Sequence, residues 1–306
     1  MVNPKLIISV NGKERIKILS YVIKFAKVSQ VPLDIVIVEQ DVQQLYSWVK
    51  NEGCEYIFAY SPNGFNRAWG FNVGVANSTP ADIYILSDAD LIFPPDYIYE
   101  SIGLMQKREM PVILPFKQIK FVKMIELEIE CVQKIKSSVG DVIETDIIAR
   151  INKLINVDRF TFHNVMNNYP HPLYTHSASC GGICICTKDY YHKTQGYNEM
   201  YEWWGCEDVD WSHKAFYLTG KHLTFNRTPH VLMHVRHPTM KPGFQSVKKH
   251  HENLAMTKQI WNINKEETVK LLKEGSLQPE WGCLNKYVEK KIMTSGGNID
   301  GTPFSH

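Results

Sequence analysis

The sequence predicts an α/β fold with a mostly parallel central sheet and flanking helices. Over roughly the first 115 residues, short apolar runs rich in β-branched residues alternate with longer segments of helical periodicity. Strands that alternate with helices in this way predict a parallel sheet, because each parallel pair needs a long crossover connection. The predicted strands are 5–10, 33–38, 56–60 and 82–86, and the predicted helices are 14–27 and 65–76.

Composition places the chain in the globular class. It has 306 residues, 44% hydrophobic and 22% charged, enough for one large domain or two small ones. The formal net charge of +2 gives no global argument for binding nucleic acid. Seven scattered cysteines, an odd number, are typical of reduced thiols. With no signal peptide and no transmembrane segment of ~20 apolar residues, we expect a cytoplasmic protein.

Two aspartates end the strand at 82–86. Asp88 and Asp90 follow the apolar run and precede a Pro-Pro break. In an open α/β sheet, ligands bind in the crevice at the carboxyl ends of the strands. Neighbouring carboxylates repel unless a cation lies between them, so the Asp-x-Asp pair predicts a divalent ion that completes its shell with ligand phosphates and water. The alternative interpretation is a solvated acidic turn.

A second acidic cluster follows two tryptophans. Glu207-Asp208-Val209-Asp210 comes directly after Trp203-Trp204-Gly205-Cys206. A carboxylate beside tryptophans is partly desolvated, which raises its pKa toward that of a useful general base. The tryptophans offer flat faces for sugar rings, with core packing as the alternative, and Asp210 suits the start of a helix.

Three histidines lie close together near residue 234. Imidazole combined with carboxylates suits Mn²⁺ better than Mg²⁺, so His234 is the choice to complete the site begun by Asp88 and Asp90. A helical zinc pair of His230 and His234 is the competing interpretation, but the apolar residues between them favour a strand. His230 and His237 also suit structural roles.

The chain divides into four predicted segments. Residues 116–174 have lysines and acids among Ile, Val and Leu at helical spacing, which predicts a helical insertion used for recognition or oligomerisation. The predicted divisions are an α/β segment at 1–115, the helical insertion at 116–174, a second segment at 175–275, and a C-terminal tail at 276–306.

Several short motifs follow one another along the chain: Phe65-Asn66-Arg67-Ala68, Asn72-Val73-Gly74, Ser87-Asp88-Ala89-Asp90-Leu91-Ile92, Gly181-Gly182, Gly196-Tyr197 and Trp204-Gly205-Cys206-Glu207-Asp208-Val209-Asp210. In this order they closely resemble the motifs of GT-A-fold glycosyltransferases. The nearest likeness is to the β-1,4-galactosyltransferase family and to the related polymerase domains for chondroitin-like chains. The resemblance covers roughly residues 1–115 and 175–260. It implies that 1–115 is the nucleotide-sugar-binding half of the domain and that 175–275 is the acceptor and catalytic half.

The resemblance implies a role for each matching residue. Asp208 matches the carboxylate that deprotonates the acceptor hydroxyl, and Glu207 beside it orients the acceptor. Asp90 matches the direct metal ligand of the Asp-x-Asp pair, with Asp88 beside it. His234 falls near the family's metal histidine, and His237 is a rival.

The resemblance also implies a donor site. Arg67 would contact the nucleotide diphosphate and Phe65 would line the nucleotide pocket. Arg15 stands where the family has a Pro-Phe-Arg element, but the Pro and the Phe are missing, which leaves base recognition open. Cys206 replaces a residue that is often glycine. The other residues expected at the donor site are Glu39, Asn72, Asp88, Gly182 and Trp204.

The implied activity is that of a metal-dependent inverting glycosyltransferase. It would use Mn²⁺ or Mg²⁺ and move a hexose or an N-acetylhexosamine from a UDP-sugar to an acceptor hydroxyl. The acceptor stays open between a glycan, a lipid-linked carrier, a protein and the hydroxylated bases of viral DNA. Nucleotidyl or phosphoryl transfer explains the Asp-x-Asp pair but not the Trp-Gly-x-Glu-Asp cluster. A degenerate sugar- or nucleotide-binding protein is the non-enzymatic alternative.

Overall fold

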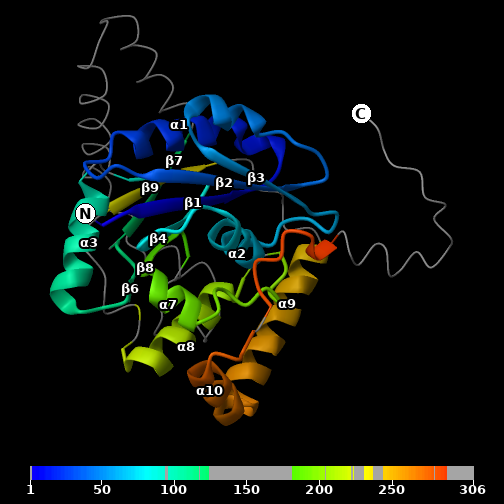
Figure 1. Ribbon diagram of the computed structural model, residues 1–306. Coiled ribbons are helices and arrows are strands. Elements are labelled where there is room, and N and C mark those ends of the chain that lie inside the picture. Colours follow the sequence, from blue (N-terminus) through cyan, green and yellow to red (C-terminus); the bar gives the residue numbers. More distant parts are fainter. Residues whose placement is uncertain are drawn as a thin grey trace, which may run out of the picture.

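The computed structural model describes residues 2–93, 96–116, 118–123, 181–203, 205–221, 223, 231–236, 244–278 and 280–287. Within these residues the strands form a six-stranded central sheet, in the order β3-β2-β1-β4-β8-β6, and a smaller sheet in the order β5-β9-β7 (Figure 1). The predicted α/β fold with a mostly parallel central sheet and flanking helices is confirmed.

Four parallel strands make up most of the central sheet. β1 lies in the middle, pairs with β2 and β4 on its two sides, and is buried along its whole length. β8 runs antiparallel to β4 and β6 antiparallel to β8. Buried strands of this kind are near-continuous apolar runs, as these sequences are. The strands are β1 Pro4–Val10, β2 Asp34–Asp41, β3 Glu55–Tyr60, β4 Ile83–Asp88, β6 Val112–Ile113 and β8 Ile183–Thr187.

The smaller sheet corrects one prediction. Gln118–Lys123, expected to begin a helical insertion, is strand β7 and pairs in parallel with β9, Val231–Arg236. Its alternation of Gln118 and Lys120 with Ile119 and Phe121 has the period of a strand, which the helical interpretation of a longer window overlooked. The rest of the predicted insertion, apart from Phe116, lies outside the described residues.

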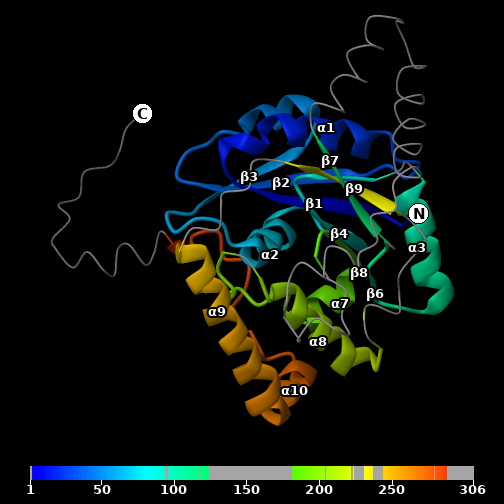
Figure 2. The same cartoon turned by 180° about the vertical axis from the view of Figure 1, so that it is seen from behind.

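Helices cover both faces of the central sheet. α1 lies on one side, and α2, α7 and α8 lie on the other, with α9 and α10 beyond them (Figures 1 and 2). Within the described residues, no helix is long and apolar enough to cross a membrane. The bounds are η1 Lys13–Arg15, α1 Ile16–Lys27, η2 Ser47–Glu52, α2 Arg67–Asn77, α3 Tyr97–Arg108, α7 Lys188–Lys193, α8 Glu207–Thr219, α9 Phe244–Lys258, the π-helical η5 Gln259–Ile263 and α10 Lys265–Glu274.

Helix α2 packs closely on the sheet and so fixes the residue at its start. A Cβ atom at Gly74 would lie 2.4 Å from a methyl carbon of Ile7 in β1, so only glycine permits this approach. Asn66 caps the helix by accepting a hydrogen bond from the backbone N–H of Trp69, 2.9 Å away. Arg67, the first helical residue, is therefore held at the edge where the parallel strands end.

The first part of the predicted C-terminal tail packs on α2. The indole N–H of Trp69 donates to the carbonyl of Cys283 at 2.9 Å, and the Trp69 ring meets Tyr287 edge-on at 5.0 Å. The backbone N–H of Gly282 donates to a carboxylate oxygen of Glu199 at 2.6 Å. Residues 280–287 are therefore part of the globular fold.

Candidate active site

The carboxyl end of β4 carries the aspartate pair into the centre of the molecule. Asp88 is the last residue of β4, and Asp90 lies between β4 and the short strand β5, Leu91–Ile92. The side chain of Asp90 is 5% exposed and that of Asp88 is 31% exposed. The backbone N–H of Asp88 donates to the carbonyl of Gly182 at 2.8 Å, which places the predicted Gly182 beside the pair.

A single guanidinium joins this strand end to the start of α8. Arg67 Nε lies 2.5 Å from a carboxylate oxygen of Asp88, and its Nη1 lies 2.6 Å from Asp208. Glu207 is within 3.6 Å of the same nitrogen. The flat face of the guanidinium lies over the ring of Phe71, 4.7 Å from its centroid. Arg67 thus links two carboxylates, Asp88 and Asp208, that lie far apart in the sequence.

Burial and charge shift the protonation of this cluster. Burial alone would lower the pKa of Arg67, but Asp208 and Asp88 outweigh that effect and hold its pKa well above the ordinary value. Burial raises the pKa of Asp88, and Arg67 opposes the rise. Burial, together with the negative charge of Asp208, raises the pKa of Glu207 to about 8.

The two neighbouring carboxylates at the start of α8 therefore differ. Glu207 is nearly enclosed, and the rise of its pKa to about 8 favours the protonated form at neutral pH. Asp208 is the more exposed side chain, at 19%, and accepts a short charge-assisted hydrogen bond from Arg67. Of the two, Asp208 has the open side that a reacting hydroxyl needs.

Asp90 faces a histidine and an arginine from two other elements. His234 lies opposite Leu91 in the pairing of β9 with β5, which brings its Nε2 to 3.2 Å from Asp90 Oδ1. The other oxygen of Asp90 lies 3.7 Å from Nε of Arg15, at the end of η1. The structure thus brings Asp90, His234 and Arg15 together.

The pair of Asp90 and His234 fits a divalent ion in chemistry and in spacing. Adjacent ligands of an octahedral ion with bonds of about 2.1 Å have donor atoms roughly 3 Å apart, close to the 3.2 Å observed. Imidazole and carboxylate donors together suit Mn²⁺. Among the described residues, no group of three or more His, Cys, Asp or Glu side chains is placed to hold an ion. Asp88 instead turns toward Arg67.

Two residues predicted for the donor site point into the fold instead. Glu39 is fully buried and accepts hydrogen bonds from the backbone N–H groups of Leu45 and Tyr46, at 2.6 and 3.1 Å. Asn72 is fully buried and donates to the Tyr197 carbonyl and to Glu199, both at 2.8 Å. The polar groups of both residues therefore hold loops in place, and a contact with the donor stays a prediction for each.

A left-handed turn precedes α8. The backbone φ angles are +65° at Trp203, +99° at Gly205 and +76° at Cys206. The backbone N–H of Trp203 donates to the carbonyl of Phe65 at 3.1 Å, which places the predicted Phe65 beside this turn. Two other predicted residues, Trp204 and His237, lie outside the described residues.

Sequence reasoning missed the amides that hold this turn. The side chain of Asn253, in α9, donates to the carbonyls of Glu202 and Gly205, both at 3.0 Å. The side chain of Asn66 donates to the carbonyl of Glu199 at 2.9 Å. Asn66 directly precedes a helical pattern, which is the signal for a helix cap. Nothing in the sequence around Asn253 marks its role, because its partners are distant in the chain.

Part of the sequence matches a known family. Residues 161–240 match the family model described as the N-terminal domain of galactosyltransferase. This match supports a glycosyltransferase and leaves the donor and the acceptor open. A search of curated proteins found no match.

Solved structures of similar shape include the following three proteins. TarS of S. aureus, residues 1–349, matches at 11% identity and a TM-score of 0.47, over 97% of this chain and 76% of that one. The mannosyltransferase PcManGT from Pyrobaculum calidifontis, solved with GDP-Man and Mn²⁺, gives the same values. Glucosyl-3-phosphoglycerate synthase from Mycobacterium tuberculosis matches at 11% identity and a TM-score of 0.48, over 84% of this chain and 79% of that one.

Proposed function

We propose that this protein is a metal-dependent, inverting glycosyltransferase of the GT-A type that moves a hexose or an N-acetylhexosamine from a UDP-sugar to an acceptor hydroxyl. One observation carries the proposal: Arg67 joins the strand-end Asp88 to Asp208 and Glu207 at the start of α8, beside the pair of Asp90 and His234. The family-model match over residues 161–240 and the order of the motifs support it.

The donor diphosphate would bind where cationic groups meet the strand ends. Arg67 and Arg15 supply two guanidinium groups, which recognise phosphate oxygens with paired N–H donors. Asp90 and His234 would hold the divalent ion, which neutralises charge on the leaving diphosphate when bound. Phosphate oxygens would compete with Asp88 and Asp208 for the guanidinium of Arg67.

The acceptor hydroxyl would approach Asp208. Competition by the diphosphate for Arg67 would release the Asp208 carboxylate, which could then take the hydroxyl proton. Attack from the face opposite the leaving diphosphate, in a single displacement, inverts the anomeric carbon. Glu207, protonated at neutral pH, would donate a hydrogen bond to orient the acceptor. The hydroxyl would belong to a glycan, a lipid-linked carrier or a protein.

The test is Asp208→Asn, compared with Asp189→Asn, an exposed aspartate in α7. Asparagine keeps the size of the side chain but cannot take a proton, so we expect turnover to fall about 10²- to 10⁴-fold. The affinity for the UDP-sugar, measured by calorimetry, should change little, and the Asp189 variant should match the wild type in both measurements. Full transfer activity in Asp208→Asn would disprove the assignment of the base.

A further inference from the structure

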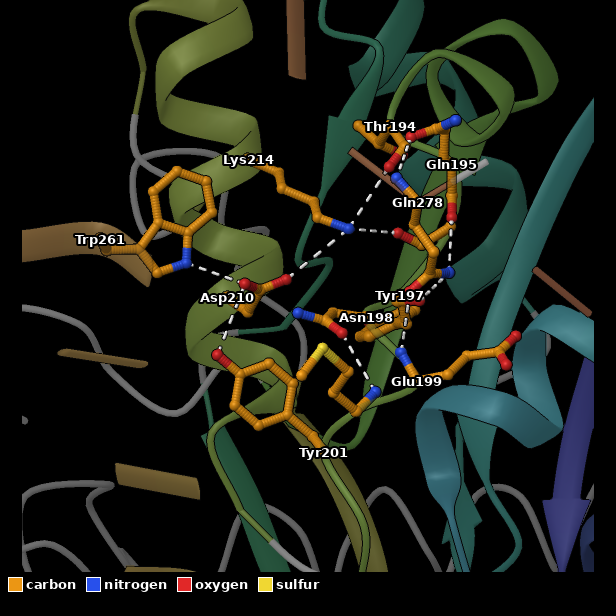
Figure 3. Close-up of polar contacts among 12 residues, drawn as sticks. Thr194, Gln195, Tyr197, Asn198, Glu199, Tyr201, Asp210, Lys214, Trp261 and Gln278 are labelled. Carbon is orange, nitrogen blue, oxygen red and sulfur yellow. Dashed lines mark hydrogen bonds and ion pairs between the residues drawn. The ribbon is translucent and has the colours of Figure 1, made fainter. Parts of the chain in front are cut away.

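A buried lysine lies in the middle of α8, away from the cluster around Arg67. The ammonium of Lys214 is fully enclosed and donates to two backbone carbonyls, those of Gly196 at 2.8 Å and Thr194 at 3.3 Å. Its third neighbour is Asp210, one turn earlier in the helix, with a carboxylate oxygen 3.6 Å away. Three partners converge on the nitrogen from two parts of the chain (Figure 3).

The partner carboxylate is equally enclosed. Asp210 accepts a hydrogen bond from the indole N–H of Trp261 in η5, at 2.8 Å, and another from the hydroxyl of Tyr201, at 3.5 Å. Figure 3 shows Trp261 and Tyr201 reaching Asp210 from different elements. Helix α8 therefore contacts both ends of the segment 196–201: Lys214 bonds to Gly196, and Asp210 accepts from Tyr201.

The same segment is also tied to α2, on its other side. The side chain of Asn66 donates to the Glu199 carbonyl at 2.9 Å, and that of Asn72 donates to the Tyr197 carbonyl at 2.8 Å. Gln278 donates to the Tyr197 carbonyl as well, at 3.1 Å. The segment 196–201 thus lies between α2 and α8, the two helices whose first turns carry Arg67 and the carboxylates Glu207 and Asp208.

Stability alone does not explain the buried ion pair of Lys214 and Asp210. Burial lowers the pKa of Lys214, which shows that the enclosed ammonium is disfavoured, although Asp210 opposes the shift. Apolar side chains of similar volume often give equal or greater stability than a buried pair. Unlike an apolar contact, the pair makes directional hydrogen bonds, because Lys214 donates to the carbonyls of Thr194 and Gly196.

We propose that Asp210 and Lys214 are positioning residues, which fix the segment 196–201 against α8 so that Asp208 meets the acceptor hydroxyl in one geometry. This inference rests on the proposed function. The segment leads directly into the left-handed turn and from there into Glu207, so a displacement of the segment would move the base. A misplacement of about 1 Å is enough to reduce turnover about 100-fold.

The test is the double variant Asp210→Asn with Lys214→Met. Removing one charge alone leaves the other buried without its partner, which threatens folding, whereas the double variant removes both and keeps an oxygen for the indole of Trp261. The matched control is Lys270→Met, an exposed lysine in α10. Three quantities are measured for each protein: the thermal midpoint, the steady-state constants for transfer, and the hydrogen exchange of the amides in 196–203.

In the double variant, we expect kcat per folded molecule to fall about 10- to 100-fold, with the KM for the donor within twofold of the wild type. The amides of 196–203 should exchange faster, while those of β1 and β4 stay protected. Lys270→Met should match the wild type throughout. Unchanged kcat per folded molecule, or a loss of activity only in proportion to unfolded protein, overturns the inference. If the wild type transfers no sugar, the proposed function fails. If hydrogen exchange of the amides in 196–203 is the same in the double variant as in the wild type, the positioning role is rejected separately.

Discussion

At the residue scale, the fold gives two adjacent carboxylates different chemistry. Glu207 and Asp208 are neighbours in the first turn of α8, yet only Asp208 is directly hydrogen-bonded to Arg67. Glu207 is nearly enclosed, so the cost of burying a charge falls mainly on it. Two carboxylates whose surroundings separate their proton affinities are the usual way in which a site obtains distinct acid and base groups.

The raised pKa of Glu207 predicts how stability depends on pH. The pKa rises from an ordinary 4.5 to about 8 in the folded protein, so the native state binds an extra proton between these values. The contribution of Glu207 to stability is complete below about pH 4.5 and is lost as the pH rises through 8. Relative to Glu207→Gln, the wild type should lose unfolding free energy between pH 5 and 8.

Urea unfolding at a series of pH values checks this expectation. Glu280→Gln changes an exposed glutamate and should give a profile parallel to that of the wild type. A Glu207→Gln profile that is also parallel to the wild type would mean that Glu207 titrates normally in the folded protein.

At the element scale, the turn before α8 has a backbone that suits glycine better than the residue present. Cys206 has a φ of +76° and is 4% exposed. The left-handed conformation costs a non-glycine residue about 1–2 kcal/mol. The strain lies immediately before Glu207 and Asp208, where rigid placement of the first turn of α8 matters most.

Comparison of glycine with alanine isolates the strain at Cys206. Both substitutions remove the thiol, but only glycine relieves the left-handed backbone, so Cys206→Gly should be more stable than Cys206→Ala by about 1 kcal/mol. The control is Ala215→Gly in the interior of α8, where glycine should instead cost about 1 kcal/mol. Denaturant unfolding of each variant measures both differences. A Cys206→Ala protein more stable than Cys206→Gly would show that the turn carries no such strain.

At the scale of the whole molecule, local patterns predicted the parallel part of the fold. The strands β1 to β4 and the helices α1 and α2 each have an apolar period that is visible within a few residues. Strand β7 was missed because its partner, β9, lies far along the chain, so no local window contains the pairing. Without that partner, the short pattern at 118–123 does not distinguish a strand from a helix.

The candidate site was predictable where a residue type and its position agreed. Asp90 follows a strand and Asp208 begins a helix, and the pairing of β9 with β5 brings His234 to Asp90. Glu39 and Asn72 are polar residues on elements of the same sheet edge, but their side chains turn inward because backbone N–H and carbonyl groups of nearby loops need their polar atoms. Side-chain direction depends on tertiary packing, which a linear motif does not contain.

Ligand binding tests the whole arrangement, because a ligand that bridges η1, the end of β4, β9 and α2 stabilises the folded molecule as a unit. A ligand at ~100 times its dissociation constant adds about 2.7 kcal/mol to the free energy of unfolding. Mn²⁺ with UDP should therefore raise the thermal midpoint by several degrees, and EDTA should abolish the part of the shift that depends on the metal. Asp90→Asn should lose that part, because a neutral amide is a weaker ligand for a hard cation.

The matched control for Asp90→Asn is Asp34→Asn, an exposed aspartate at the amino end of β2, on the far edge of the sheet. It should keep the full shift with Mn²⁺ and UDP. A shift that is equally large in Asp90→Asn would place the ion elsewhere, whereas a shift with UDP that EDTA leaves unchanged would mean that Arg67 and Arg15 bind the diphosphate without a metal. Because Arg15 lies 3.7 Å from Asp90, the comparison with and without EDTA, rather than the Asp90 variant alone, separates the contribution of the metal from that of the guanidinium groups.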